Sequence, residues 1–181
     1  MLDIVSIIKA AGYFGMFGIL FAESGLFFGF FLPGDSLLFT AGFLASQGYL
    51  NIIVLILFSF TGAVLGDSFG YYFGKRIGPA IFTKQDSLLF DRGHINRAQR
   101  FYEKYGAKTI ILARFVPVVR TFAPILAGVG NMRYPVFLLF NVAGGFLWAV
   151  CLPLIGYFFG NAIPNIDRYL VPIILFIIFT S

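Results

Sequence analysis

Charged residues are scarce in this chain. Only 12% of its 181 residues are Asp, Glu, Lys or Arg, whereas a soluble domain carries about 25%. Hydrophobic residues make up 59% and aromatic residues 19%, and the mean hydropathy is +0.90. This composition excludes an ordinary soluble domain, and we expect residues 1–181 to form a single membrane domain.

Cysteine, histidine and tryptophan each occur once. Cys151 lies in an apolar stretch, so no disulfide framework exists, and His94 lies in a basic segment where we expect it to be solvated. Without a His/Cys ligand set, a nucleophile elbow or a phosphate-binding glycine loop, the sequence predicts no metal, no cofactor and no enzyme. We expect Trp148 to be a packing residue and Asn141 to hydrogen-bond between helices.

The two halves of the chain share a pattern. The matching positions are Ala22-Glu23 and Ala113-Arg114, each with a proline ten residues later, then Ala41-Gly42 and Ala127-Gly128, and finally the pentapeptides 70–74 and 156–160. An internal repeat of proline-interrupted, charge-bearing apolar segments is typical of membrane transporters.

Each half contains an apolar segment that proline interrupts. In residues 15–47, the turn signal Pro33-Gly34 separates an arm from Glu23 to Pro33 and an arm from Ser36 to Gln47. Each arm could climb roughly 15 Å if helical, about half of a ~30 Å hydrocarbon core. These lengths predict a re-entrant helical hairpin.

The second interrupted segment spans residues 107–131. It carries Pro117 and Pro124, which we expect to break the helix. A half-helix that starts at such a break directs its free N–H groups towards anions. We therefore predict a second re-entrant hairpin here.

Longer apolar runs predict helices that cross the membrane. Residues 52–74 and 134–158 are long enough to span. In the first, glycines at every fourth position from Gly62 to Gly78 would let another helix approach closely. Residues 168–181 begin a third helix, whose length is short for a complete span.

A basic segment separates the two halves. Eight of the thirteen Lys and Arg residues lie between Lys75 and Lys108, which predicts a cytoplasmic location for this segment. Because the basic residues cluster at one membrane face, the net charge of +5 does not indicate nucleic acid. Residues 92–105 have one apolar helical face and predict an amphipathic helix on the inner leaflet.

Counting the crossings predicts an inverted repeat. A hairpin returns to its own side and each half then crosses once, so the second half starts on the opposite side from the first. The predicted fold is an all-α integral membrane protein, with repeat 1 over residues 12–78, a linker over 79–105, repeat 2 over 106–162 and a C-terminal helix over 168–181. The first hairpin would enter from outside and the second from the cytoplasm, with their tips near the midplane.

Four charged residues lie inside the predicted hairpins, namely Glu23, Asp35, Arg114 and Arg120. Each costs roughly 2.5–3.5 kcal/mol at a helix centre, so we expect opposite charges to pair across the hairpins. Glu23 and Arg114 are equivalent in the repeat and could lie close together. Structural ion pairs are one interpretation. The other is a site for an anionic headgroup and protons, because arginine binds phosphate bidentately and a buried carboxylate can exchange protons. Asp67 could belong to this site or hydrogen-bond locally.

An ordered set of motifs covers most of the chain. It comprises Glu23, the run from Phe31 to Leu38, Gly66-Asp67, Tyr71, Gly74-Lys75, Ala113-Arg114-Phe115, Pro117, Arg120-Thr121, Pro124 and Ala127-Gly128. Over about residues 10–165 the chain resembles the DedA family, also called the SNARE-associated or VTT-domain family.

The resemblance implies a bacterial inner-membrane protein with two inward re-entrant hairpins. Members of the family are implicated in flipping undecaprenyl phosphate back to the cytoplasmic leaflet for cell-envelope synthesis, and others in fitness that depends on the proton-motive force. Eukaryotic relatives scramble phospholipids. The resemblance also implies that Glu23, Asp35, Arg114 and Arg120 are essential.

These observations favour a polyprenyl-phosphate flippase that is coupled to protons. Arg114 and Arg120 would bind the phosphate, and Glu23, Asp35 and Asp67 would form ion pairs in the empty site and carry protons. The alternatives are a proton-coupled antiporter of small cations or drugs, a phospholipid scramblase and a non-transporting scaffold. The expected partners are undecaprenyl phosphate or another phosphate-bearing lipid, protons and membrane lipid, and the chain could be a monomer or a homodimer.

Overall fold

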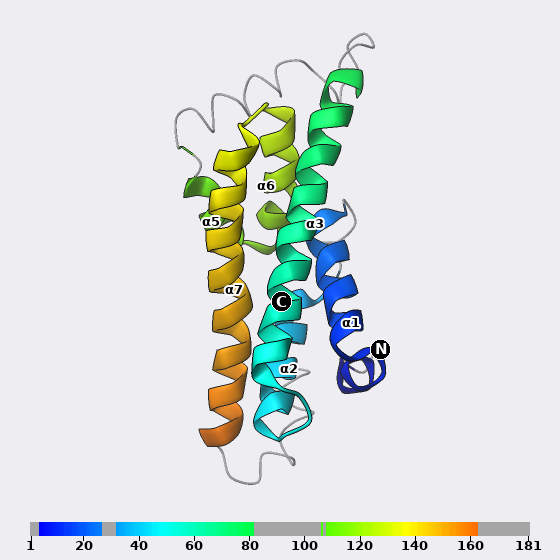
Figure 1. Cartoon of the computed structure of the whole chain (residues 1–181), viewed down its shortest axis with the longest axis vertical. Helices are drawn as coiled ribbons and strands as arrows, with labels where there is room; N and C mark the ends of the chain where they lie inside the picture. The colour runs from blue at the N-terminus through cyan, green and yellow to red at the C-terminus, as the bar shows by residue number, and fades with distance from the viewer. Residues whose placement is uncertain (1–3, 27–31, 82–105, 107, 163–181) are drawn as a thin grey trace.

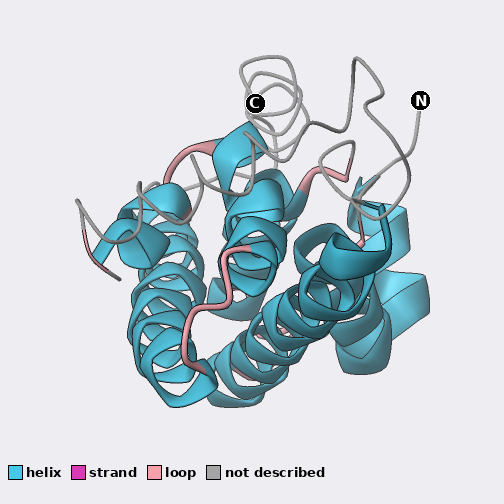
Figure 2. Ribbon diagram, turned by 90° about the horizontal axis from the view of Figure 1, so that it is seen from above, coloured by secondary structure: helices cyan, strands magenta, loops and turns pink. Residues whose placement is uncertain are grey.

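The computed structural model describes residues 4–26, 32–81, 106 and 108–162. These residues form helices and no strand (Figures 1 and 2), which confirms the predicted all-α class. The helices are α1 (Ile4–Gly25), α2 (Gly34–Ser46), α3 (Ile52–Ile81), α5 (Lys108–Ala113), α6 (Pro117–Val129) and α7 (Tyr134–Ala162). The predicted amphipathic helix at 92–105 and the predicted C-terminal helix at 168–181 lie outside the described residues.

Two helices are long and apolar enough to cross a membrane, namely α7 and the Ile52–Arg76 part of α3. They run in opposite directions along the long axis of the molecule (Figure 1). The two predicted spans are therefore confirmed in length and composition. α3 continues to Ile81, past the predicted start of the linker at residue 79. Lys75 and Arg76 extend the helix, as expected from the high helix propensity of lysine and arginine.

The short helices flank the long ones in two pairs. In Figure 1, α1 and α2 lie in the lower part of the view and α5 and α6 in the upper part. The predicted arm from Glu23 to Pro33 is not one helix from its start, because α1 ends at Gly25, and residues 27–31 of this arm lie outside the described residues. Glycine has a low helix propensity, and a Cβ on Gly25 would lie 2.7 Å from the carbonyl oxygen of Gly66 on α3.

Prolines mark two helix starts and one helix interior. Pro33 precedes the first residue of α2, Gly34, and Pro117 is the first residue of α6, so these predicted breaks are confirmed. The break predicted at Pro124 is wrong, because this residue lies inside α6. Its fixed φ suits a helix, and membrane helices tolerate proline where neighbouring groups satisfy the freed backbone.

Glycines let the short helices approach α3 closely. α1 packs at Gly62 and Gly66, where an added Cβ would lie 2.8 Å from the carbonyl oxygen of Phe17 and 2.6 Å from that of Phe21. α6 packs further along the same helix, where Gly74 faces a backbone carbonyl of α6. The predicted glycine ridge is therefore used within the chain, by two different helices.

The second short helix of each half packs against the long helix of the other half. α2 crosses α7, where Gly42 faces the carbonyl of Pro153. α6 crosses α3, where Gly128 faces the carbonyl of Tyr71. Gly42 and Gly128 are the matched glycines of the repeat, so the same sequence feature makes both crossings. The two halves are interleaved rather than placed side by side.

Polar side chains lie inside the helix bundle, and large apolar side chains lie on its surface. The exposed side chains include Phe14, Ile53, Leu139 and Phe146. The buried polar and charged residues are Glu23, Ser24, Ser36, Thr40, Ser59, Asp67, Ser68, Arg114, Thr121 and Asn141. This distribution suits a lipid environment, and the buried polar and charged residues indicate a functional site in the interior of the bundle.

Replacing Gly42 by alanine should destabilise the protein. The added Cβ would overlap the backbone of Pro153, and overpacking of this kind costs about 1–3 kcal/mol. The matched control is Gly18→Ala on α1, where a Cβ meets nothing within 4 Å and which should be neutral or slightly stabilising. Thermal unfolding in detergent measures both changes. Equal unfolding temperatures for the two variants would contradict the close crossing of α2 and α7.

Candidate functional site

Side chains from four helices meet at Arg120 of α6. Its guanidinium forms ion pairs with Glu23 of α1 and Asp35 of α2, the second at 2.6 Å between Nη1 and Oδ1. Trp148 of α7 donates a hydrogen bond from Nε1 to the same Oδ1 of Asp35, at 2.7 Å. The Arg120 Cζ atom lies 5.0 Å from the centroid of the Trp148 ring, in cation–π geometry. We call these four residues the Arg120 cluster.

Glu23 is the innermost member of the Arg120 cluster. It lies on the last turn of α1, is fully buried and faces the N-terminus of α2. Its Oε1 accepts hydrogen bonds from Arg120 and from the backbone N–H of Gly34, the latter at 3.3 Å. A Cβ on Gly34 would overlap the carboxylate, so a side chain at this position would displace Glu23. Oε2 of Glu23 has no hydrogen-bond partner in the part of the chain that the structure describes.

Asp35 forms the accessible edge of the Arg120 cluster. Its side chain is 29% exposed, compared with 10% for Arg120 and 0% for Glu23. It lies in the first turn of α2, where the helix dipole favours a carboxylate. A group that enters from outside would therefore contact Asp35 and Arg120 before it reached Glu23.

The Arg120 cluster holds more acid than base. With every group ionised, the carboxylates of Glu23 and Asp35 face one guanidinium, which leaves one negative charge in excess. An uncompensated charge in a low-dielectric interior is costly. One proton on Glu23 would balance the cluster. Protonation of Oε2 would break no hydrogen bond, because this atom accepts none from the described residues.

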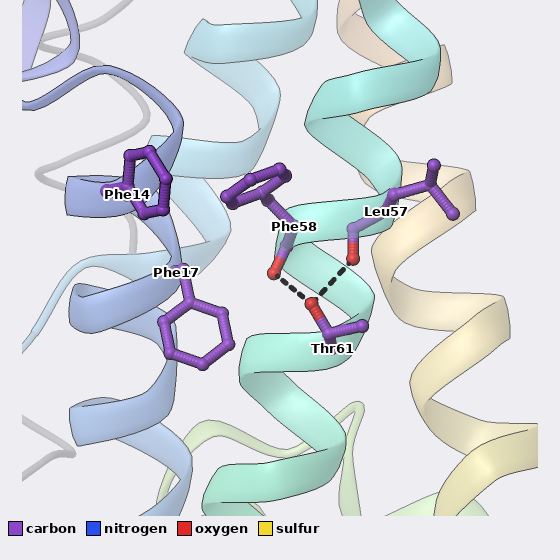
Figure 3. A pocket seen from close by; sticks show the side chains of 5 residues that line it. All are labelled: Phe14, Phe17, Leu57, Phe58 and Thr61. Carbon is purple, nitrogen blue, oxygen red and sulfur yellow. Dashed lines mark hydrogen bonds between the residues drawn. The ribbon is translucent and has the colours of Figure 1, made fainter.

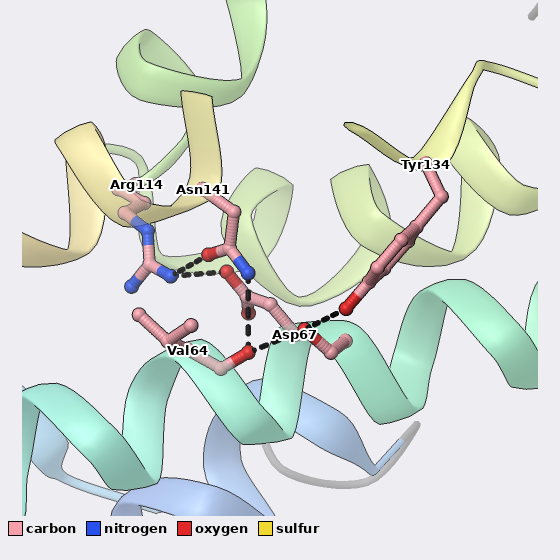
Figure 4. A network of polar contacts seen from close by, with 6 residues as sticks. Val64, Asp67, Arg114, Tyr134 and Asn141 are labelled. Carbon is pink, nitrogen blue, oxygen red and sulfur yellow. Dashed lines mark hydrogen bonds and ion pairs between the residues drawn. The ribbon is translucent and has the colours of Figure 1, made fainter. Parts of the chain in front are cut away.

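Arg114 lies in a second, closed network (Figure 4). It follows α5, and its Nη2 donates to Asp67 of α3 and to Oδ1 of Asn141 on α7. The Nδ2 of Asn141 donates to the carbonyl oxygen of Val64 at 3.1 Å, which links α7 to α3. The side chains of Arg114 and Asp67 are 4% and 5% exposed. We call Arg114, Asp67 and Asn141 the Arg114 cluster.

The structure divides the residues of the predicted site into these two clusters. Arg120 pairs with both hairpin acids, as expected for opposite charges in apolar surroundings. Glu23 and Arg114, which the repeat could have placed close together, do not form an ion pair with each other, because Glu23 pairs with Arg120 and Arg114 pairs with Asp67. Arg114 ends the α5 segment, which packs on α7, whereas Arg120 follows the break at Pro117 on α6, which contacts α1.

Trp148 is a member of the site that the sequence did not indicate. We expected a packing residue, and it is buried, but its N–H and its ring face both contact charged groups. A buried indole N–H requires an acceptor, and this requirement could have indicated that Trp148 makes a polar contact. That the acceptor is Asp35 could not be predicted from the sequence. The prediction that Asn141 hydrogen-bonds between helices is confirmed. Within the described ranges, no group of three or more His, Cys, Asp or Glu side chains could hold a metal ion.

Comparisons with known proteins agree with the resemblance drawn from the motifs. The VTT domain family model matches residues 32–158, which is more than half of the chain. An uncharacterised membrane protein of Mycobacterium leprae is 48% identical over 163 residues, covering 90% of this chain and 72% of the relative. Protein DedA of Escherichia coli K12 is 46% identical over 168 residues, covering 92% and 76%.

A more distant relative carries a name that gives its location. Inner membrane protein YqjA of Escherichia coli K12 is 36% identical over 150 residues, which cover 82% of this chain and 68% of the relative. No solved structure matches the chain. The family model and these identities together show that the chain belongs to the DedA family of VTT-domain membrane proteins.

Proposed function

We propose that this protein moves undecaprenyl phosphate from the outer to the inner leaflet of the bacterial cytoplasmic membrane, coupled to protons, for reuse in envelope synthesis. The observation that carries the proposal is the Arg120 cluster. It places an arginine inside an apolar bundle, compensated by one buried and one accessible carboxylate. Membership of the DedA family and the inner-membrane location of YqjA support it.

In the proposed mechanism, the two halves of the chain form an inverted repeat. The α1–α2 pair and the α5–α6 pair flank opposite halves of the two long helices (Figure 1), which supports the proposed relation between the halves. Basic residues occur at the end of α3, the start of α5 and just before α7, namely Lys75, Arg76, Lys108 and Arg133. By the positive-inside rule that end is cytoplasmic, so α1 and α2 enter from the outside.

Arg120 is the first ligand of the lipid phosphate in this mechanism. The phosphate approaches past the accessible carboxylate of Asp35 and replaces it on the guanidinium, whose planar fork matches two phosphate oxygens. Arg114 is closed off by Asp67 and Asn141, so it receives the phosphate in a later state, after Asp67 has released it.

Protons balance the charge of the incoming phosphate. The cluster already carries one carboxylate in excess, and a bound phosphate adds further negative charge next to Glu23 and Asp35. Binding therefore favours protonation of these acids, and protons and lipid move inward together. Glu23 carries the coupled proton, on the Oε2 atom that has no described hydrogen-bond partner.

The isoprenoid tail follows an apolar groove between α1 and α3 (Figure 3). Its lining residues are Phe14, Phe17, Leu57, Phe58 and Thr61, around a cavity of about 290 Å³. The Thr61 hydroxyl donates to carbonyl groups of its own helix, so the groove presents no free polar group to the tail. Phe17 and Glu23 lie on the same helix, about 9 Å apart along its axis. In this mechanism, a lipid whose phosphate is at the cluster lays its tail along this groove.

Replacing Arg120 by alanine should reduce the transbilayer movement of undecaprenyl phosphate in proteoliposomes at least about tenfold, because charge-assisted hydrogen bonds to the phosphate are lost. Arg120→Lys should fail nearly as badly, since lysine lacks the planar fork. Arg133→Ala, outside both clusters, is the matched control and should transport normally.

The same assay separates the alternatives. Movement by Arg120→Ala at the wild-type rate would refute the proposed function. Full movement of the lipid by Arg120→Lys would reduce Arg120 to a counter-ion. No lipid movement by the folded wild type, together with transport of small cations by the same vesicles, would favour a proton-coupled antiporter.

Replacing Glu23 by glutamine should remove the dependence on a proton gradient. Wild-type movement should accelerate when the outer side is acidified. Glutamine has the shape of a protonated glutamate and cannot exchange its proton, so the variant should transport at a rate that the gradient does not change. The measurement is flux with and without an imposed pH gradient, with Arg133→Ala as the control. A variant that still responds as the wild type does would assign the coupled proton to another group.

A further inference from the structure

We propose that Trp148 controls how readily Arg120 exchanges Asp35 for a lipid phosphate. Trp148 is then a positioning residue, and this inference rests on the proposed function of the Arg120 cluster. Its indole contacts both members of the Arg120–Asp35 ion pair, through the N–H on one side and the ring face on the other.

The Trp148 N–H stabilises Asp35 in the state in which Arg120 has left. Trp148 Nε1 and Arg120 Nη1 both donate to Oδ1 of Asp35, at 2.7 Å and 2.6 Å. Because Oδ1 accepts both hydrogen bonds, the hydrogen bond between Arg120 and Asp35 is weaker than it would be with Arg120 as the single donor. When Arg120 turns to the phosphate, Asp35 keeps one donor and is not left as an unpaired charge. Without the indole N–H, the departure of Arg120 would leave Asp35 unsatisfied.

The ring face of Trp148 keeps Arg120 in place during the exchange. The Arg120 Cζ atom lies over the ring, 5.0 Å from its centroid, and this cation–π attraction does not depend on Asp35, so it persists when the guanidinium turns to a phosphate. Trp148 is also 3% exposed and lies on α7, the helix against which α2 packs, so its position relative to Asp35 is well determined. The N–H and the ring therefore make separate contributions that two substitutions can separate.

The first test is binding of farnesyl phosphate, a short isoprenyl phosphate, to the full chain in detergent by calorimetry. Trp148→Phe keeps a ring face and loses the N–H, and its affinity should fall about tenfold, the effect of one hydrogen bond to a charged group. In an Asp35→Asn background, the same substitution should have little further effect, because the N–H acts through the carboxylate. Phe146→Leu, an exposed position on the same helix, is the matched control.

A second readout needs no substitution. Trp148 is the single tryptophan of the chain, so the tryptophan emission of the wild type reports on this indole alone. Farnesyl phosphate should change that emission in a saturable way, and farnesol, which lacks the phosphate, should not. The change should disappear in Arg120→Ala.

The outcomes distinguish the two proposals. Wild-type affinity in Trp148→Phe, equal losses in both backgrounds, or emission that is unchanged at saturation would each overturn the role of Trp148. If binding in these cases is still lost in Arg120→Ala, the proposed function stands without it. If the folded wild type does not bind farnesyl phosphate, the proposed function and this inference fail together.

Discussion

Two arginines inside an apolar bundle determine how closely its helices have to pack. A guanidinium in hydrocarbon has to be compensated by carboxylates at contact distance. α1 and α2 bring Glu23 and Asp35 to Arg120, and α3 brings Asp67 to Arg114. Such contacts require helices that pack tightly, and the glycines at the crossings provide that closeness. The charges of the two arginines can therefore be compensated only because the helices pack closely.

The ion pairs also join the two halves of the chain. Both arginines belong to the second half, and all three of their acids belong to the first. Any ligand that takes Arg120 from its carboxylates therefore weakens the contact between the halves at the same moment. In the proposed transport this links phosphate binding to the opening of the bundle, while the buried Arg114 cluster keeps the halves together. The proposed mechanism therefore includes a second arrangement of the halves, which lipid binding makes accessible.

The fold was largely predictable from the sequence, and the partners within the site were not. Low charge and long apolar runs predicted the two spanning helices, and Pro33 and Pro117 marked real helix starts. The prediction failed at Pro124, which lies inside α6, because membrane helices can accommodate an interior proline. The partner of Glu23 depends on how α1 and α6 are rotated about their axes, which no repeat pattern records. Trp148 was missed for the same reason, because its acceptor comes from a helix more than 100 residues away in the chain.

In the proposed mechanism, the Arg120 guanidinium leaves Asp35 and binds the lipid phosphate directly. The most direct measurement is solid-state NMR dipolar recoupling between arginine ¹⁵N and lipid ³¹P, in bilayers that contain the protein and undecaprenyl phosphate. We expect a ¹⁵N–³¹P coupling at hydrogen-bonding distance in the wild type. The same signal should be absent from Arg120→Lys. An identical coupling in both proteins, or none in a wild type with bound lipid, would contradict this mechanism.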